Sequence, residues 1–272
     1  MTYITPNNGI NISTSTFPTI TTVTSIQPTV PTPQAIKQSL GAAFKPKKAG
    51  KNTSHIVFLL DDSGSMQSCR DQTIAGFNEF LEGQKHDAKE TGIKTFVSLY
   101  KFDGSNVKSE FDHVDVNEVA NLTRYNYNPS GGTNLLDAMG GVMMNINLLL
   151  SKTKKDMRES IIIVALTDGE ENSSRTFRNN DIKQMVEKAE AKNWGFMFLG
   201  ANVDAFAVGA QFGFNQHNTM QYDTSNMQAT MRSASAMSSR MKTSYSEGMD
   251  TTLAYASSAF TDAERNISGK GE

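Results

Sequence analysis

The chain contains short runs that are almost wholly apolar, separated by longer stretches in which apolar residues recur every three or four positions. Runs of the first kind predict strands buried on both faces, and they are HIVFLLD (55–61), SIIIVALTD (160–168) and WGFMFLGA (194–201). Stretches of the second kind predict amphipathic helices, and they are 70–90, 135–150 and 179–192. Strands that alternate with helices predict an α/β fold, in which a mostly parallel sheet is covered on both faces.

Shorter patterns complete this sheet. Residues 93–103 alternate as a strand, and the Gly104-Ser105 turn leads to VKSEF (107–111), so a hairpin is expected. NEVANL (117–122) is a candidate short helix, and residues 203–212 are another. HNTMQYD (217–223) predicts a last strand at the edge of the sheet. The α/β domain is therefore expected to span 51–222.

The first 50 residues have a different composition, dominated by Thr, Ser and Pro. Repeated proline blocks helices and central strands, and this composition cannot bury a core. Two interpretations remain open: a disordered tail, or an extended arm that docks on a neighbour in an assembly.

The C-terminal 50 residues, 223–272, predict a helical tail in two pieces broken near Gly248. Met249, Leu253, Ala256 and Phe260 follow one another at helical spacing. This stripe either packs on the chain's own domain or binds a partner, and in the second case Leu253 and Phe260 are the expected contacts.

Charge and composition exclude several classes of protein. The formal net charge of −2 argues against a general nucleic-acid binder, which would carry a basic face. No apolar run approaches about 18 residues, so no membrane span is expected. The single cysteine, Cys69, cannot form an internal disulfide, and the N-terminus lacks the order of a signal peptide. We therefore expect a cytoplasmic protein, or a component of a virion assembled in the cytoplasm.

Three polar segments stand where they can meet at one edge of the sheet. The first strand ends in Asp61-Asp62-Ser63-Gly64-Ser65, and the strand at 160–168 ends in Thr167-Asp168-Gly169. The loop Gly131-Gly132-Thr133 lies between them in sequence. Ligands of such sheets bind beyond the carboxyl ends of the strands, where these loops converge.

The chemistry of these side chains indicates a cation site. Hydroxyl and carboxylate oxygens are hard ligands, which select Mg²⁺, with Mn²⁺ or Ca²⁺ as alternatives, over zinc or copper. The expected metal ligands are Asp61, Ser63, Ser65, Thr133 and Asp168. If neutral hydroxyls bind directly and the acids act partly through water, the ion remains electrophilic and seeks an acidic group from outside.

Other interpretations of Asp61 to Ser65 are weaker. The segment by itself is compatible with an ordinary helix N-cap. A serine nucleophile at Ser63 would need a nearby histidine, and His55 lies six residues earlier on the same strand, about 20 Å away. A phosphate-binding loop would need a glycine-rich turn with lysine, which is missing from the sequence here.

The order D-x-S-x-S, then a Gly-Gly-Thr-Asn loop, then T-D-G resembles the von Willebrand factor A domain family, over about residues 54–222. In that family the three segments form a metal-ion-dependent adhesion site. The resemblance implies a Rossmann-like doubly wound sheet and a Mg²⁺-dependent face that binds protein, and it extends weakly to bacterial and phage-encoded members. It says nothing about residues 1–50.

These observations lead to a functional expectation. The chain is expected to be a non-enzymatic module that binds an Asp or Glu of a protein partner through Mg²⁺. Asp62, Gly132 and Glu170, beside the ligands, are the expected partner contacts together with the two tail residues. The alternative is a structural component of a large assembly, such as a phage virion, that docks through residues 1–50 and the tail. A metal-dependent hydrolase is the third hypothesis.

Overall fold

Strand β1 (Thr53–Asp61) lies at the centre of the sheet, in a computed structural model that describes residues 52–154, 159–201 and 204–269. The side chains of Ile56 to Leu60 are all 0% exposed, as a parallel strand covered on both faces requires. The expected arm, residues 1–50, lies outside the described residues. Both neighbours of β1 run parallel to it, β2 (Lys94–Phe102) on one side and β4 (Ser160–Thr167) on the other.

The sheet has six strands among the described residues, in the order β3-β2-β1-β4-β5-β6. Strand β3 (Val107–Asp115) is antiparallel to β2, which confirms the predicted hairpin. Strands β5 (Trp194–Gly200) and β6 (Thr219–Gln221) extend the parallel part, and β6 is the predicted edge strand. This strand order is that of a Rossmann-like doubly wound sheet, and the predicted fold class is confirmed.

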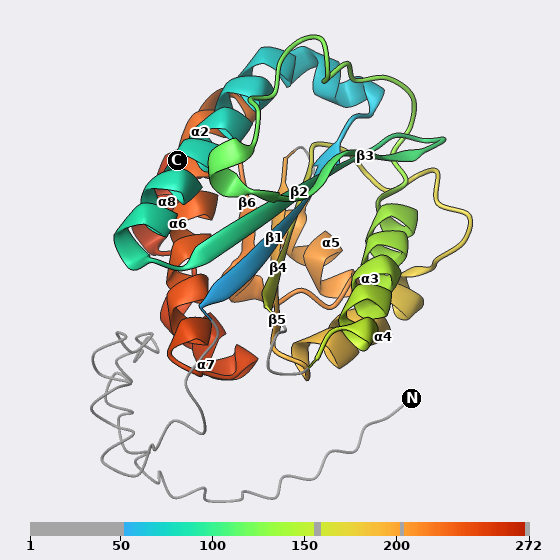
Figure 1. Ribbon diagram of the computed structural model, residues 1–272. Helices are drawn as coiled ribbons and strands as arrows, with labels where there is room; N and C mark the ends of the chain where they lie inside the picture. Colours follow the sequence, from blue (N-terminus) through green and yellow to red (C-terminus); the bar gives the residue numbers. More distant parts are fainter. Residues whose placement is uncertain (1–51, 155–158, 202–203, 270–272) are drawn as a thin grey trace, which may run out of the picture. The chain divides into compact units, whose positions relative to one another are not determined.

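Helices cover both faces of the sheet (Figure 1). One layer contains α2 (Arg70–Thr91) and α6 (Met227–Ser246). The 3-10 helix η2 (Gly64–Cys69) leads directly into α2. The other contains α3 (Leu135–Lys152), α4 (Asn179–Glu190) and α5 (Ala205–Gln211). At NEVANL the structure has only a single 3-10 turn, η3 (Val116–Glu118). Within the described ranges, none of the helices is both long and apolar enough to cross a membrane.

The C-terminal helices are part of the domain, which corrects the expected boundary at residue 222. Helix α6 packs along α2, and its buried side chains belong to the same core cluster as Ile56 and Phe58 of β1. These side chains are spaced by three or four residues, and they are Met227, Met231, Ala234, Met237, Met241 and Tyr245. This stripe is the apolar face of an amphipathic helix, and α2 and the sheet cover it.

The predicted stripe from Met249 to Phe260 is not one helical face. Gly248 adopts φ 80° and ends α6, and α7 (Thr251–Ser258) stops before Phe260. Phe260 is 5% exposed and belongs to the core, so the expectation that it contacts a partner is wrong, whereas Leu253 is half-buried. The chain then forms a third piece, α8 (Asp262–Ser268), where two pieces were expected.

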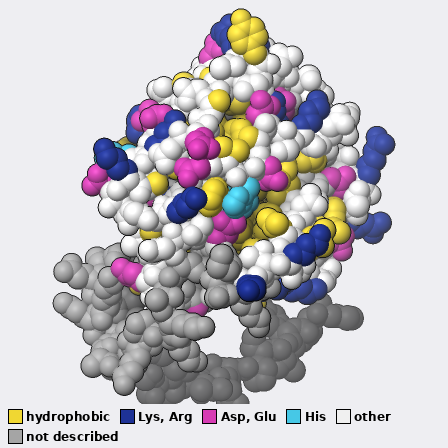
Figure 2. Space-filling model, viewed as in Figure 1, with side chains coloured by type: hydrophobic (Ala, Val, Ile, Leu, Met, Phe, Trp, Pro, Cys, Tyr) yellow, Lys and Arg dark blue, Asp and Glu magenta, His cyan; other side chains and the backbone are white. Residues whose placement is uncertain are grey.

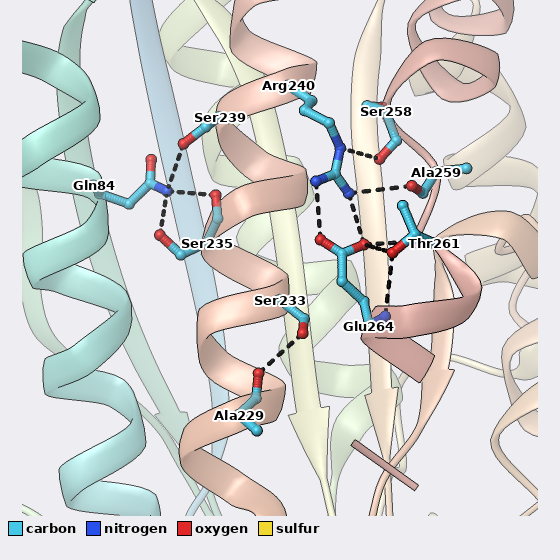
Figure 3. Close-up of polar contacts among 10 residues, drawn as sticks. All are labelled: Gln84, Ala229, Ser233, Ser235, Ser239, Arg240, Ser258, Ala259, Thr261 and Glu264. Atoms are coloured by element: carbon cyan, nitrogen blue, oxygen red, sulfur yellow. Dashed lines mark hydrogen bonds and ion pairs between the residues drawn. The ribbon is translucent and has the colours of Figure 1, made fainter. Parts of the chain in front are cut away.

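Polar contacts hold the C-terminal helices in place (Figure 3). Arg240 of α6 forms a two-point ion pair with Glu264 of α8, with nitrogen–oxygen distances of 2.9 and 3.0 Å. Gln84 of α2 donates to the backbone oxygen of Ser235 at 2.8 Å. The surface in the view of Figure 2 mixes acidic and basic side chains rather than separating them.

Candidate metal centre

The candidate centre lies at the carboxyl ends of β1 and β4. The chain leaves β1 toward β2 on one side and later returns to β4 on the other, so this end of the sheet is a topological switch point. Leu60 pairs with Leu166 in the register of the two strands, which places Asp61 beside Thr167. The first and last of the predicted segments therefore meet across adjacent strands.

Asp61 is fully buried and firmly oriented. Its Oδ1 accepts a hydrogen bond from the backbone N–H of Ser63 at 2.8 Å, and its Oδ2 accepts one from the hydroxyl of Thr167. Both carboxylate oxygens thus have a donor from the chain itself. This arrangement suits an acid that reaches a cation through water more than one that offers a free oxygen.

Three of the predicted ligands form a continuous chain of oxygens. Ser63 Oγ lies 3.1 Å from Ser65 Oγ, and Ser65 Oγ donates to Asp168 Oδ1 at 2.5 Å. Neighbouring ligands of an octahedral Mg²⁺ lie about 2.9 Å apart, given metal–oxygen bonds of about 2.0–2.1 Å. The three oxygens therefore already have the spacing of a coordination shell.

The glycine loop supplies Thr133 from the third segment. Gly131 adopts φ 78°, a left-handed conformation that favours glycine, and its carbonyl accepts from Gly64 N–H at 3.0 Å. A Cβ built on Gly169 would lie 3.3 Å from Ser65 Oγ and 3.4 Å from Thr133 Oγ1. Both hydroxyls therefore face the same small space beside Gly169.

The two buried carboxylates of the site, Asp61 and Asp168, have no basic side chain paired with them among the described residues. Burial raises the pKa of Asp61 to about 6, and burial also raises the pKa of Asp168. Across residues 52–154, 159–201 and 204–269, neither carboxylate forms an ion pair with a lysine, arginine or histidine. In the loops around the site, buried Oδ1 atoms of Asp62 and Asn134 have no hydrogen-bond partner. A divalent cation with its waters fits this donor set.

Comparison with protein families matches residues 55–243 to the von Willebrand factor type A domain. The chain belongs to this family. The match covers more than half of the chain and includes most of α6, in agreement with the packing of that helix. A comparison with curated protein sequences finds no match.

Solved structures resemble the von Willebrand factor A domain of this chain at low sequence identity. Proximal thread matrix protein 1 from the mussel byssus is 14% identical with a TM-score of 0.51, and the match covers 70% of this chain and 48% of that one. The chain thus spans about half the length of the mussel protein. Manganese-loaded TRAP protein from Plasmodium vivax is 15% identical with a TM-score of 0.43, over 66% and 72% of the two chains.

The residues expected to contact a partner lie in three different settings on this von Willebrand factor A domain. Asp62 is only 9% exposed, which leaves little of it accessible to a partner, and burial raises its pKa. Glu170 is exposed, as a contact with a partner would require. Gly132 is half-buried, and a Cβ there would lie 2.3 Å from Ser173 Oγ, so a side chain at this position would displace Ser173.

Two residues that support the site were missed from sequence. Tyr127 is fully buried and donates its hydroxyl to the backbone oxygen of Asp61 at 2.7 Å. Glu171 is half-buried and accepts from the N–H groups of Leu136 and Ser174 at 3.0 and 2.8 Å. Glu171 thus ties the loop after β4 to the amino end of α3. Glu171 and Leu136 are 35 positions apart in sequence, so no local pattern predicts this contact.

Proposed function

We propose that this chain is a protein-binding module in which Mg²⁺, held at the candidate centre, binds a carboxylate of a partner. The observation that carries the proposal is the difference between the hydroxyl ligands, which are neutral, and the Asp61 carboxylate, which is already hydrogen-bonded. Ser63, Ser65 and Thr133 offer neutral hydroxyls, whereas both oxygens of Asp61 already accept hydrogen bonds from the chain. A divalent ion held in this way keeps much of its positive charge, which an outside Asp or Glu would neutralise.

The same geometry supports a binding role over a catalytic one. A hydrolase would need a general base within hydrogen-bond reach of the reacting group. His55 and His113 lie at the opposite end of the sheet, near Glu159, which immediately precedes β4. His86 is exposed on α2, and His217 belongs to a 3-10 turn before β6.

The loop that frames the site presents an aromatic side chain to solvent. Tyr125 is 100% exposed and lies two residues from Tyr127, which bonds to Asp61. Arg70 anchors this loop by donating hydrogen bonds to the backbone oxygens of Arg124 and Tyr127. An exposed tyrosine on an anchored loop is a common binding hot spot in protein interfaces, so Tyr125 is assigned to the partner surface.

Affinity capture from native lysate, with the purified full chain as bait, tests the proposal. The probe is the chain in Mg²⁺ or in EDTA, compared with the Ser65→Ala variant. The control is Ser105→Ala, which removes an exposed hydroxyl in the β2–β3 turn. A partner should be retained by the parent and by the control in Mg²⁺, and lost in EDTA and in Ser65→Ala.

A captured partner then allows a sharper test. Replacing its acidic residues one at a time should identify a single Asp or Glu whose amide variant binds at least about tenfold more weakly. Tyr125→Ala in this chain should weaken binding without affecting Mg²⁺ affinity. Capture that is equally strong in EDTA and in Ser65→Ala would reject the metal-dependent mechanism.

A further inference from the structure

A second cluster of potential metal ligands lies at the other end of the sheet. His55, near the start of β1, His113 on β3 and Glu159, just before β4, each offer one ligand atom, and these atoms lie within 4.8 Å of one another. Six residues of β1 separate His55 from Asp61, so the cluster is about 20 Å from the candidate centre described above. It therefore cannot share that ion.

A β-bulge brings His113 into this cluster. Val97 pairs with Val114 and Leu99 with Phe111, so both Asp112 and His113 lie opposite Ser98 alone. His113 adopts φ 52°, which is rare for a residue with a Cβ. Bulges with unusual backbone angles re-aim side chains, and here Nε2 of His113 lies 2.8 Å from Glu159 Oε1.

Ser98 determines which nitrogen of His55 carries the proton. Its hydroxyl donates to Asp112 Oδ1 at 2.6 Å and accepts from His113 N–H at 2.8 Å. Ser98 Oγ also lies 2.7 Å from His55 Nε2. Because the single hydroxyl proton points to Asp112, Nε2 of His55 must be the donor in this contact. The neutral ring therefore has an unprotonated Nδ1.

That Nδ1 atom is buried and unsatisfied. The side chain of His55 is 2% exposed, and Nδ1 has no hydrogen-bond partner. Burial lowers the pKa of His55 to about 4, which keeps the ring neutral at physiological pH. Glu159 Oε1 lies 3.8 Å from this nitrogen. A cation between this nitrogen lone pair and the carboxylate oxygen would give the buried nitrogen the partner that it lacks.

The dimensions and surroundings fit a transition metal. Ligands of a tetrahedral zinc ion lie about 3.3 Å apart, given bonds of about 2.0–2.1 Å, and the separations of 2.8 and 3.8 Å from Glu159 Oε1 bracket this value. His55 donates to Ser98, and Ser98 donates to Asp112. Hydrogen bonds of this kind, on the ring nitrogen that does not bind the metal, orient metal-binding histidines in proteins. His113 is 37% exposed, so solvent reaches the site.

We propose that His55 Nδ1, His113 Nε2 and the Glu159 carboxylate bind one zinc-class ion, with water as the fourth ligand. Two imidazoles and one carboxylate are a ligand set that zinc takes in proteins with an open position. The ion would join the edge strand β3 to the start of β1 and to the residue that precedes β4. This site does not depend on the function proposed for the other end of the sheet.

Cobalt(II) titration of the full chain tests the proposal, because four-coordinate cobalt has intense visible absorption and replaces zinc isosterically. The titration is run with excess Mg²⁺ and in the Ser65→Ala background, which is expected to weaken the other centre. The test variant is His113→Asn, since asparagine tolerates a left-handed backbone and is a poor zinc ligand. His86→Ala, an exposed histidine of α2, is the matched control.

One equivalent of cobalt should give the four-coordinate spectrum in the Ser65→Ala protein and in the control, and added zinc should displace it. His113→Asn should raise the dissociation constant at least about tenfold, and Glu159→Gln should do the same. Circular dichroism shows whether each variant is folded. Unchanged cobalt affinity in folded His113→Asn, or octahedral spectra alone in the Ser65→Ala protein, would overturn the proposal.

Discussion

Ser65 Oγ donates a hydrogen bond to Asp168 Oδ1 at 2.5 Å, although 103 positions separate the two residues in sequence. The contact joins the loop after β1 to the end of β4. Ser65 is exposed while Asp168 is buried, so the pair marks where the candidate centre opens to solvent. A cation bound there would replace the hydrogen bond by two metal–oxygen contacts.

Ser65→Ala is the cleanest test of metal binding. The substitution removes one predicted ligand at an exposed position, whereas replacing the fully buried Asp61 also disturbs its contacts with Ser63 and Thr167. The dissociation constant for Mg²⁺ or Mn²⁺ should rise about 10–100-fold in calorimetry. Ser105→Ala should bind like the parent, and unchanged affinity in Ser65→Ala would remove that residue from the ligand set.

Hydrolysis of a generic phosphoester should be undetectable in Mg²⁺ or Mn²⁺. The reason is that Ser63 Oγ has Ser65 Oγ as its neighbour, Ser65 donates in turn to Asp168, and no histidine among the described residues accepts the Ser63 proton. A chromogenic phosphate ester measures this directly. Metal-dependent turnover that disappears in Asp168→Asn would reject the binding role and support an enzyme.

Asp137 should make stability depend on pH. Burial raises the pKa of its carboxyl, but backbone N–H groups of Arg175, Phe177 and Thr176 outweigh this effect, and the pKa lies below its ordinary value near 3.8. A carboxyl with a lowered folded pKa contributes stability that is present above its unfolded pKa and is lost as the pH falls through the folded value.

Urea denaturation at pH 7 and at pH 3 measures this contribution. Asp137→Asn should lower the free energy of unfolding by about 1–2 kcal/mol at pH 7, and the difference from the parent should shrink at pH 3. Asp262→Asn, an exposed aspartate of α8, should differ little from the parent at either pH. A constant penalty for Asp137→Asn at both pH values would contradict the assignment.

Arg240→Lys should destabilise the C-terminal helices. The guanidinium donates to both carboxylate oxygens of Glu264 and also to the backbone oxygens of Ser258 and Ala259, at 3.2 and 3.1 Å (Figure 3). A lysine ammonium cannot reproduce this planar fork. Chemical denaturation should show a loss of about 1–3 kcal/mol.

The matched control for Arg240→Lys is Arg232→Lys on the same helix. Arg232 pairs with Glu79 at 3.6 Å with both side chains well exposed, and such surface pairs contribute about 0–1 kcal/mol. Arg232→Lys should therefore leave the unfolding midpoint nearly unchanged. Equal effects of the two substitutions would show that α8 contributes little to the cooperative unit.

Local patterns determined most of the sheet and the residues of the candidate centre. Parallel strands that are buried on both faces have continuous apolar sequences, so β1, β4 and β5 could be recognised without knowing their neighbours. The candidate ligands could be identified because the carboxyl ends of parallel strands lie at the same edge of a sheet, and this does not depend on the loops that connect the strands. The spacing of D-x-S-x-S and T-D-G then indicated the family.

Tertiary structure decided what depends on contacts between distant segments. The sequence predicts α6 as part of a tail, since a methionine stripe does not say which surface covers it until α2 is in place. Phe260 was assigned to a partner for the same reason. The His55–His113–Glu159 cluster depends on a bulge that shifts β3 by one residue, and such a shift moves side chains across the sheet with no local signal in sequence.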